Sequence, residues 1–236
     1  MSRILTLCWK EWRITMDTPM GYVVAAAFLL ASGFFFGNNL FLIGQADMRG
    51  YFSVVPLLLM FFVPAMTMRM LADEQRSGTF ELLATMPART IDIVLGKYLS
   101  VLVQVSVLLA FTLVYPLSLS LLGDVDGGQI AAAYLAAMLL AAAYVAVCLY
   151  ASSLSNHAVV SYVAGFGMLL ALFLTAQAAP TFSPAVQDWI AMTSPLTHYQ
   201  YMLRGVLGLD DIVLLLLLNG IFLALTWFQL ERRRWR

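Results

Sequence analysis

Few side chains in this sequence are of a type that does chemistry. The 236 residues include two histidines, His157 and His198, and two cysteines, Cys8 and Cys148, which lack the spacing of a metal or redox motif. There is no G-x-x-x-x-G-K-S/T loop for nucleotide phosphates, no H-E-x-x-H and no G-x-S-x-G. An intramembrane enzyme would need a nucleophile beside a base, or a metal cluster. We therefore expect no catalytic residue, no metal site and no cofactor bound by this chain.

The polar stretch EQRSGTFELLATMPART, residues 74–90, lies between two apolar runs and mixes both signs of charge. Its apolar side consists of Phe80, Leu82, Leu83 and Met86. Glu81 sits among them, and Pro87 ends the pattern. A short amphipathic helix of this kind either rests on the membrane surface or fits a groove in a soluble partner, where apolar anchors and charges determine the register. The residues alone leave both interpretations open.

The composition indicates an all-α integral membrane protein. Hydrophobic residues make up 62% of the chain and charged residues 11%, whereas a soluble domain has roughly 25% charged residues. Backbone groups find no water partners in lipid, so spanning segments of about 20 apolar residues form helices. Six apolar runs qualify as transmembrane helices: residues 20–43, 54–71, 93–122, 130–152, 159–178 and 212–230. A net charge of zero gives no indication of a nucleic-acid partner.

The distribution of basic residues predicts the orientation. With the N-terminus inside, 11 of the 13 Lys and Arg residues lie in inner segments, and only Arg49 and Arg204 lie outside. We therefore expect both termini to be cytoplasmic in a multi-pass protein of the inner (plasma) membrane. The first apolar run exceeds 20 residues, which is too long for a signal-peptide core of roughly 7–15.

Two further segments flank the spans. Residues 1–19 place Leu5, Cys8, Trp9, Trp12 and Met16 on one helical face, which predicts an amphipathic helix in the inner interface. That helix is either a plain anchor or an element with a second role. Residues 179–211 are semi-apolar and contain three prolines, so we expect short re-entrant helices on the outer side. Residues 91–99 are expected to extend the third span into the cytoplasm.

The spans themselves carry few polar side chains. Gln104, Gln177 and Asn219 are uncharged, and such residues more often hydrogen-bond between helices than bind substrate. Because ionisable residues mark ion and proton paths, a proton-coupled carrier or a channel with a charged filter is poorly supported. Prolines 56, 64 and 116 predict kinks.

A resemblance to a known family chooses between the two interpretations of residues 74–90. The stretch DEQRSGTFELLATMPARTIDIVLGKYL closely resembles the signature of type-2 ABC transporter permeases. The matching residues are Glu74, Arg76, Gly78, Thr79, Glu81, Leu82, Pro87, Gly96 and Lys97. The stretch SPLTHYQYMLRGVLGLDD looks like that of the gliding-motility-associated Gld F type of permease. This second pattern runs through Ser194, Pro195, His198, Arg204 and Gly205.

The resemblance implies an architecture and a set of partners. It implies a single transmembrane domain over residues 1–236, with a coupling helix at 73–90 that docks a cytoplasmic P-loop ATPase dimer. ATP and Mg belong to that partner. The implied contact residues are Glu74, Arg76, Gly78, Thr79, Phe80, Glu81 and Met86, and a second coupling loop contains Ser155, Asn156 and His157. The other partners are membrane lipid and a second permease subunit, either the same chain or one with an extracytoplasmic domain.

Two functions remain open at the level of sequence. One is export of a hydrophobic or envelope-related substrate, driven by the separate ATPase. The alternative is mechanotransmission, in which the subunit relays ATPase motion to an extracytoplasmic partner without transporting a substrate. The near absence of polar residues along the spans fits both functions.

Overall fold

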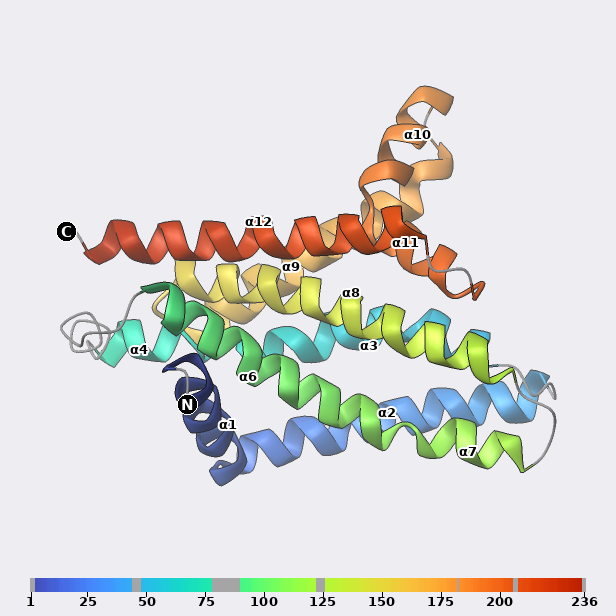
Figure 1. The fold of residues 1–236 in the computed structure, drawn as a ribbon, viewed down its shortest axis with the longest axis horizontal. Helices are drawn as coiled ribbons and strands as arrows, with labels where there is room; N and C mark the ends of the chain where they lie inside the picture. The colour runs from blue at the N-terminus through green and yellow to red at the C-terminus, as the bar shows by residue number, and fades with distance from the viewer. Residues whose placement is uncertain are drawn as a thin grey trace.

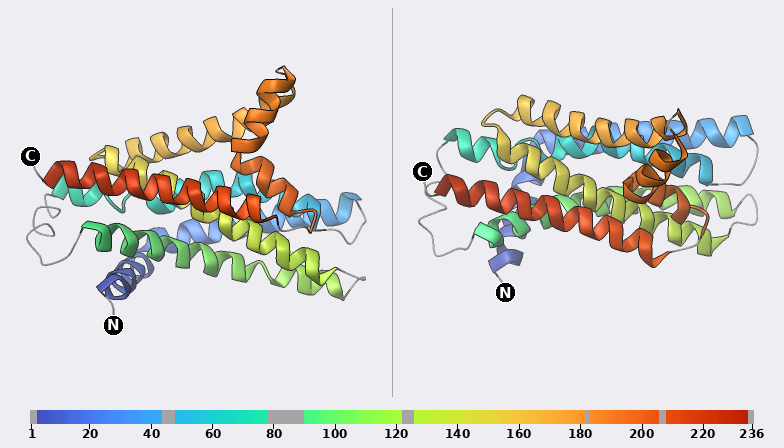
Figure 2. Two further views of the ribbon diagram at one scale, coloured as in Figure 1. Left: turned by 45° about the horizontal axis from the view of Figure 1, so that its top comes forward. Right: turned by 90° about the horizontal axis from the view of Figure 1, so that it is seen from above.

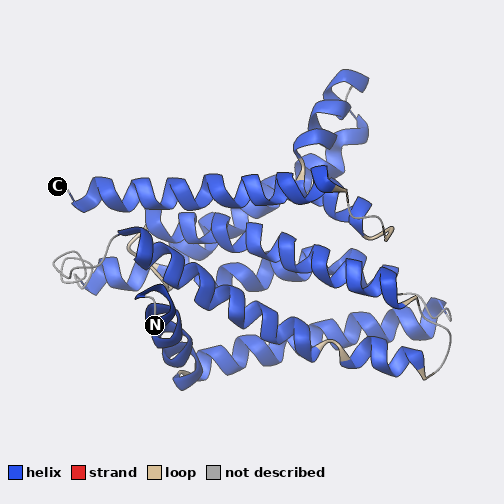
Figure 3. Cartoon of the chain, viewed as in Figure 1, coloured by secondary structure: helices blue, strands red, loops and turns tan. Residues whose placement is uncertain are grey.

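The computed structural model describes residues 3–43, 48–77, 90–121, 126–181, 183–205 and 208–234. Within these ranges the chain is helical and contains no strand (Figure 3). The elements are α1 (Arg3–Asp17), α2 (Pro19–Ile43), α3 (Arg49–Thr67), α4 (Ala72–Ser77), α6 (Thr90–Phe111), α7 (Val114–Ser120), α8 (Gly127–Leu154), α9 (Ala158–Ala178), η1 (Ala179–Thr181), α10 (Pro184–Thr193), α11 (Pro195–Met202) and α12 (Leu209–Arg234).

Six helical segments of the described chain are long and apolar enough to cross a membrane, which confirms the predicted all-helical, six-span fold class. They run over Pro19–Asn39, Arg49–Arg76, Thr90–Ser120, Gly127–Leu154, Ala158–Ala178 and Leu209–Arg232. Figure 1 shows them lying side by side along one axis. We call the end of this bundle that holds both chain termini the terminal end, and the other the opposite end.

Helix α8 forms the centre of the bundle. It contacts α3, α6, α9, α11 and α12 (Figures 1 and 2). Several of its alanines, among them Ala136, Ala137 and Ala141, are fully buried, and small side chains allow neighbouring helices to approach closely. Of the most apolar stretch of each span, 67% is buried in α8 but only 11% in α2 and 17% in α9. The outer spans therefore present apolar faces to lipid or to another protein.

The third span is interrupted at a proline, as predicted. Helix α6 ends at Phe111 and α7 begins at Val114. A proline lacks a backbone N–H and its ring clashes with the carbonyl four residues earlier, which for Pro116 is that of Thr112. The Thr112 hydroxyl donates to the Leu109 carbonyl at 2.7 Å and so occupies a backbone acceptor at the break. Pro56 and Pro64, in contrast, lie inside the unbroken helix α3.

Short helices close both ends of the bundle. Helix α1 lies across the bundle at the terminal end, as the predicted interfacial helix would, and packs against α6 (Figure 1). Residues 91–99, which we expected to extend the third span into the cytoplasm, form the first part of α6 and pack against α1. Within residues 179–211, the described part forms η1, α10, α11 and the first turn of α12; α10 projects sideways from the bundle (Figure 2). Tyr199 of α11 is fully buried, and its hydroxyl donates to the Phe52 carbonyl at 2.7 Å.

Candidate functional site

The segments that the sequence assigned to partner binding meet at the terminal end. Glu74 and Arg76 lie on the short helix α4, where Arg76 is exposed and Glu74 is half-buried. Helix α4 contacts α8 and α9, the two helices joined by the turn at Ser155, Asn156 and His157. The remaining predicted contact residues lie outside the described residues: Gly78, Thr79, Phe80, Glu81 and Met86.

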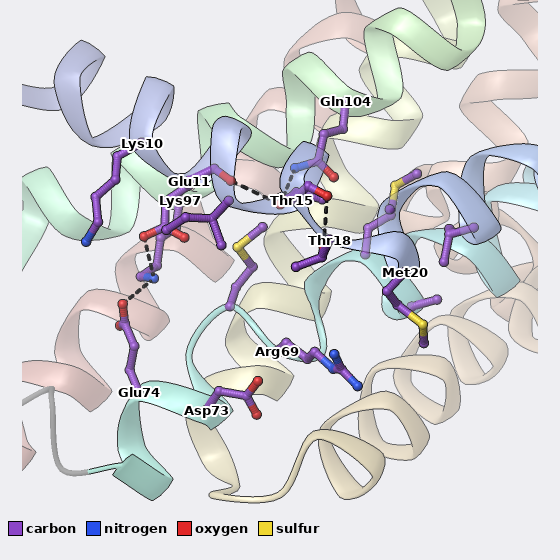
Figure 4. A pocket seen from close by; sticks show the side chains of 16 residues that line it. Lys10, Glu11, Thr15, Thr18, Met20, Arg69, Asp73, Glu74, Lys97 and Gln104 are labelled. Carbon is purple, nitrogen blue, oxygen red and sulfur yellow. Dashed lines mark hydrogen bonds and ion pairs between the residues drawn. The ribbon is translucent and has the colours of Figure 1, made fainter.

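A buried lysine joins three of these elements. Lys97 of α6 is only 3% exposed, and its ammonium nitrogen lies 2.7 Å from Glu74 Oε1 and 3.2 Å from Glu11 Oε1 (Figure 4). A buried charge is stable only when it is paired and hydrogen-bonded, so the two carboxylates hold the ammonium group in place. The ion network therefore links α1, α4 and α6.

The crossing of α1 over α6 requires a glycine. A Cβ atom at Gly96 would lie 2.8 Å from the Leu7 Cβ atom, a distance that side chains do not adopt. Ile4, Leu7 and Cys8 are half-buried along this crossing, whereas Trp9 is exposed on the other side of α1. Gly96 and Lys97, adjacent in sequence, thus allow the close approach and supply the charge that secures it.

Side-chain hydrogen bonds join α4 to the end of α8. The Leu71 N–H donates to Ser152 Oγ at 3.2 Å, and that hydroxyl donates to the Met68 carbonyl at 3.3 Å. The Gln75 amide donates to the Ser153 carbonyl at 3.1 Å. Ser153 lies two residues before the turn at Ser155, so this hydrogen bond connects α4 to the end of α8 next to that turn.

The turn at residues 155–157 is ordered by its own serine. Ser155 Oγ accepts a hydrogen bond from the His157 N–H at 3.1 Å. His157 occupies the N-cap position of α9, but its side chain makes no capping hydrogen bond and is exposed, as is Asn156. These exposed side chains leave the turn accessible to a partner.

A third connection joins the start of α6 to the end of α12. The Thr90 hydroxyl donates to Glu231 Oε2 at 2.6 Å. We use the name terminal network for Glu11, Glu74, Gln75, Thr90, Lys97, Ser152, Ser153 and Glu231. Six of these residues were not predicted as site residues from the sequence: Glu11, Gln75, Thr90, Ser152, Ser153 and Glu231. The signal that could have found most of them is a polar side chain at the boundary of an apolar run.

The predicted outer motif lies toward the opposite end and holds α10, α11 and α12 together. Ser194 caps α11, with Pro195 in its first turn. His198 Nδ1 lies 2.5 Å from Asp211 Oδ1, and its Nε2 lies 3.2 Å from the Met192 carbonyl oxygen. Because both ring nitrogens face acceptors, only the doubly protonated ring donates to both.

The same motif ends in a tight turn. The Arg204 guanidinium lies 5.5 Å from the centre of the Tyr201 ring, which is a cation–π distance. Gly205 has a φ of 85°, a left-handed conformation that favours glycine. The described residues of this motif cap α11 and join it to α10 and α12. In the structure they therefore stabilise the fold of this segment.

Two of the three polar residues predicted to bridge helices do so, whereas Gln177 of α9 is exposed and makes no such bond within the described residues. The Gln104 amide donates to Thr15 Oγ1 at 3.3 Å and joins α6 to α1. The Asn219 amide donates to the Tyr98 hydroxyl at 2.6 Å and joins α12 to α6. Within the described chain no group of three or more potential metal ligands comes together.

A cavity of about 310 Å³ opens beside the terminal network, between α1, α2, the end of α3, α4 and α6 (Figure 4). Charged and polar residues line one part of it: Lys10, Glu11, Thr15, Thr18, Arg69, Asp73, Glu74, Lys97 and Gln104. Apolar residues and one glycine line the rest: Ile14, Met20, Gly21, Val24, Ala65, Met66 and Met70.

The six helices that are long and apolar enough to cross a membrane define a polytopic membrane protein. The sequence model of the ABC-2 family transporter proteins matches residues 45–228, which is more than half of the chain. The chain therefore belongs to the ABC-2 family and is the membrane-spanning permease subunit of an ABC transporter. Permeases of this family work in general with a cytoplasmic ABC ATPase. No match was found among curated proteins.

Proposed function

We propose that this permease couples ATP hydrolysis by a separate cytoplasmic ATPase dimer to the export of a hydrophobic or envelope-related substrate. The observation that supports the proposal is the terminal network. It joins α4, which leads into residues 78–89, to the turn at Ser155 through Gln75 and Ser153. An ATPase that moved either segment would move both.

The proposed transmission starts at α4. When ATP and Mg close the ATPase dimer, its grooves displace α4 and the segment that follows. Lys97 passes this displacement to α1 and α6, because its ammonium group is held by Glu11 and Glu74. The Ser152 hydrogen bonds pass it to α8, the centre of the bundle. The seam between two permeases, formed in this proposal by the first, second and fifth spans, then opens or closes.

The proposal places the terminal end in the cytoplasm of an inner (plasma) membrane. The positive-inside distribution of Lys and Arg supports this orientation. Both termini, α4 and the turn at Ser155 lie at that end in the structure (Figure 1), so in this orientation they would all face a cytoplasmic ATPase.

We further propose that this permease is of the Gld F type. The stretch from Ser194 to Gly205 supports the subtype, because it folds as one unit with α12 through His198 and Asp211. The second permease of the complex is then either the same chain or a subunit with an extracytoplasmic domain. The exposed apolar faces of α2 and α9 offer the surface for it.

Co-purification in mild detergent, followed by mass spectrometry and ATPase assays, tests the proposal. We expect a P-loop ATPase to accompany the chain. In that complex, Glu81→Ala lowers coupled ATPase activity by about tenfold, the effect of losing one central interface contact. Arg13→Ala, at an exposed position of α1, is the matched control and leaves the rate unchanged.

Two outcomes would contradict the proposal. If the chain purifies without an ATPase at every detergent concentration, it is not coupled to ATP hydrolysis by a partner. An unchanged rate for Glu81→Ala in a fully assembled complex removes Glu81 from the docking surface. Stimulation of the ATPase by amphiphiles favours export, whereas stimulation only by an extracytoplasmic protein favours the relay.

A further inference from the structure

The cavity beside the terminal network changes from charged to apolar along its length. Helix α2 starts at Pro19 and runs away from the terminal end, so Val24 lies about 7 Å further into the bundle. Ala65 lies on α3, whereas Arg69 follows the end of α3 at Thr67 and so lies nearer the terminal end. Arg69, Asp73 and Glu74 therefore line the part nearest the terminal end, and Val24 and Ala65 line the part within the apolar run.

The charged part of the cavity contains two cations, Lys10 and Arg69, whose side chains make no hydrogen bond or ion pair within the described structure. Lys97 is occupied by Glu11 and Glu74. The Arg69 guanidinium, in contrast, makes no hydrogen bond or ion pair with any residue in the described ranges, and its side chain is exposed. In Figure 4 it extends along the cavity toward Met20. A guanidinium presents a planar set of N–H donors that matches a phosphate group.

The overall charge of the lining restricts the class of ligand. Three cations, Lys10, Arg69 and Lys97, stand against three carboxylates, Glu11, Asp73 and Glu74, so the lining has no net charge. A phosphate that carries its own ammonium group suits such a site better than a head group with a net negative charge, because the nearby carboxylates repel the latter.

The volume and the apolar part determine how much of the ligand fits. About 310 Å³ is at the lower end of small-molecule sites, which span roughly 300–1,000 Å³. This is room for a head group and the first carbons of a chain. Met20, Met66 and Met70 line the space beyond the charges, and flexible methionines adapt to chains of varied shape. The rest of the chain would lie in the bilayer.

We propose that this cavity binds one zwitterionic glycerophospholipid from the leaflet at the terminal end. Its phosphate lies on Arg69, and its acyl chains leave along Met66 and Val24. The site belongs to a single chain, and the binding does not depend on whether the complex exports a substrate or relays motion.

Photo-crosslinking in nanodiscs tests the proposal on the full chain. The probe is phosphatidylethanolamine with a diazirine early in one acyl chain, and the labelled peptides are mapped by mass spectrometry. We expect labelling at Met20, Met66 or Met70. Arg69→Gln lowers it by about tenfold, the effect of losing a charge-assisted phosphate contact. Arg13→Gln, at the same end of the bundle but outside the cavity, keeps wild-type labelling.

Three further comparisons determine the ligand class. Met66→Trp fills the cavity without removing the guanidinium, so it also abolishes labelling and tests the site if Arg69→Gln fails to fold. A phosphatidylglycerol probe that labels as strongly as phosphatidylethanolamine overturns the zwitterionic class. If millimolar inorganic phosphate suppresses labelling, the proposal that the site binds a lipid is wrong, and the cavity is instead a site for free anions. Equal labelling of all variants would contradict the proposal that the lipid binds in this cavity. Since no ATPase is present, these results are independent of those that test the proposed function.

Discussion

Lys97 is the residue on which the terminal end depends most. Moving an ammonium group out of water costs several kcal/mol, and only nearby opposite charges with good hydrogen-bond geometry offset that cost. The structure supplies two carboxylates, from α1 and from α4, at 3.2 and 2.7 Å. The lysine that the family signature contains after Gly96 therefore has a structural reason to be there.

Replacing Lys97 by methionine tests this reasoning. We expect Lys97→Met to lower the free energy of unfolding by about 3 kcal/mol, because it leaves Glu11 and Glu74 close together without a cation. Denaturant titration of the purified chain in detergent measures the change.

The control removes the charges that the first variant leaves behind. In the triple variant Lys97→Met, Glu11→Gln and Glu74→Gln, neutral side chains replace the whole ion network, so we expect most of the lost stability to return. If the triple variant is as unstable as Lys97→Met alone, the ion network does not hold these elements together.

At the scale of elements, the position of α1 depends on its crossing with α6. The Gly96 position has no room for a methyl group, because a Cβ there would lie 2.8 Å from the Leu7 Cβ atom. Cys8 lies next to this contact, and its burial raises the pKa of its thiol above the usual value. A thiol with a raised pKa carries less thiolate at neutral pH and reacts slowly with maleimide.

Gly96→Ala should therefore expose the Cys8 thiol. We expect the added methyl group to push α1 away from α6, to lower the Cys8 pKa toward its usual value and to speed labelling by maleimide several-fold at pH 7. Cys148 is only 1% exposed and remains unlabelled. Labelling rates of the full chain in detergent measure the effect.

Gly220→Ala in α12 is the matched control, since no atom lies within 4 Å of its Cβ position. It should leave the Cys8 rate unchanged. Leu7→Gly combined with Gly96→Ala should return the rate toward that of the wild type. Slow labelling of Gly96→Ala would show that α1 is not held at this crossing.

Local signals explain several element boundaries because they act within a few residues. Proline in the first turn starts α2 and α11. The Asp126 carboxylate caps α8 by accepting from the Gly128 and Gln129 N–H groups at 3.0 and 3.3 Å. The break before Pro116 follows from the same kind of local geometry.

For the whole molecule, the arrangement of the ends predicts a topology that can be measured. In a background of Cys8→Ser and Cys148→Ser, we compare Arg76→Cys on α4 with Arg204→Cys after α11. Both positions are exposed and lie in different parts of the bundle. We expect a membrane-impermeant maleimide applied from outside intact spheroplasts to label position 204 and not position 76, because the terminal end faces the cytoplasm.

Permeabilised cells provide the control, in which both positions label. Labelling of position 76 from outside would reverse the proposed orientation. The cytoplasmic ATPase could then not reach α4.

The sequence by itself determined the class of protein, the six spans and the helical form of the ends. Lipid acts as a solvent on each segment separately, so a run of apolar residues and its flanking charges are sufficient to predict a span. The motif around residues 74–97 also predicted the family to which residues 45–228 belong. These are properties of short, contiguous stretches.

Only the tertiary structure decided which polar side chains meet. Lys97 is 86 residues from Glu11, and Gln75 is 78 residues from Ser153. No periodicity connects positions so far apart, since their contact depends on how α1 crosses α6 and how α4 packs on α8. The burial of Lys97 and the cavity at Arg69 arise in the same way, because both require several helices to come together in space.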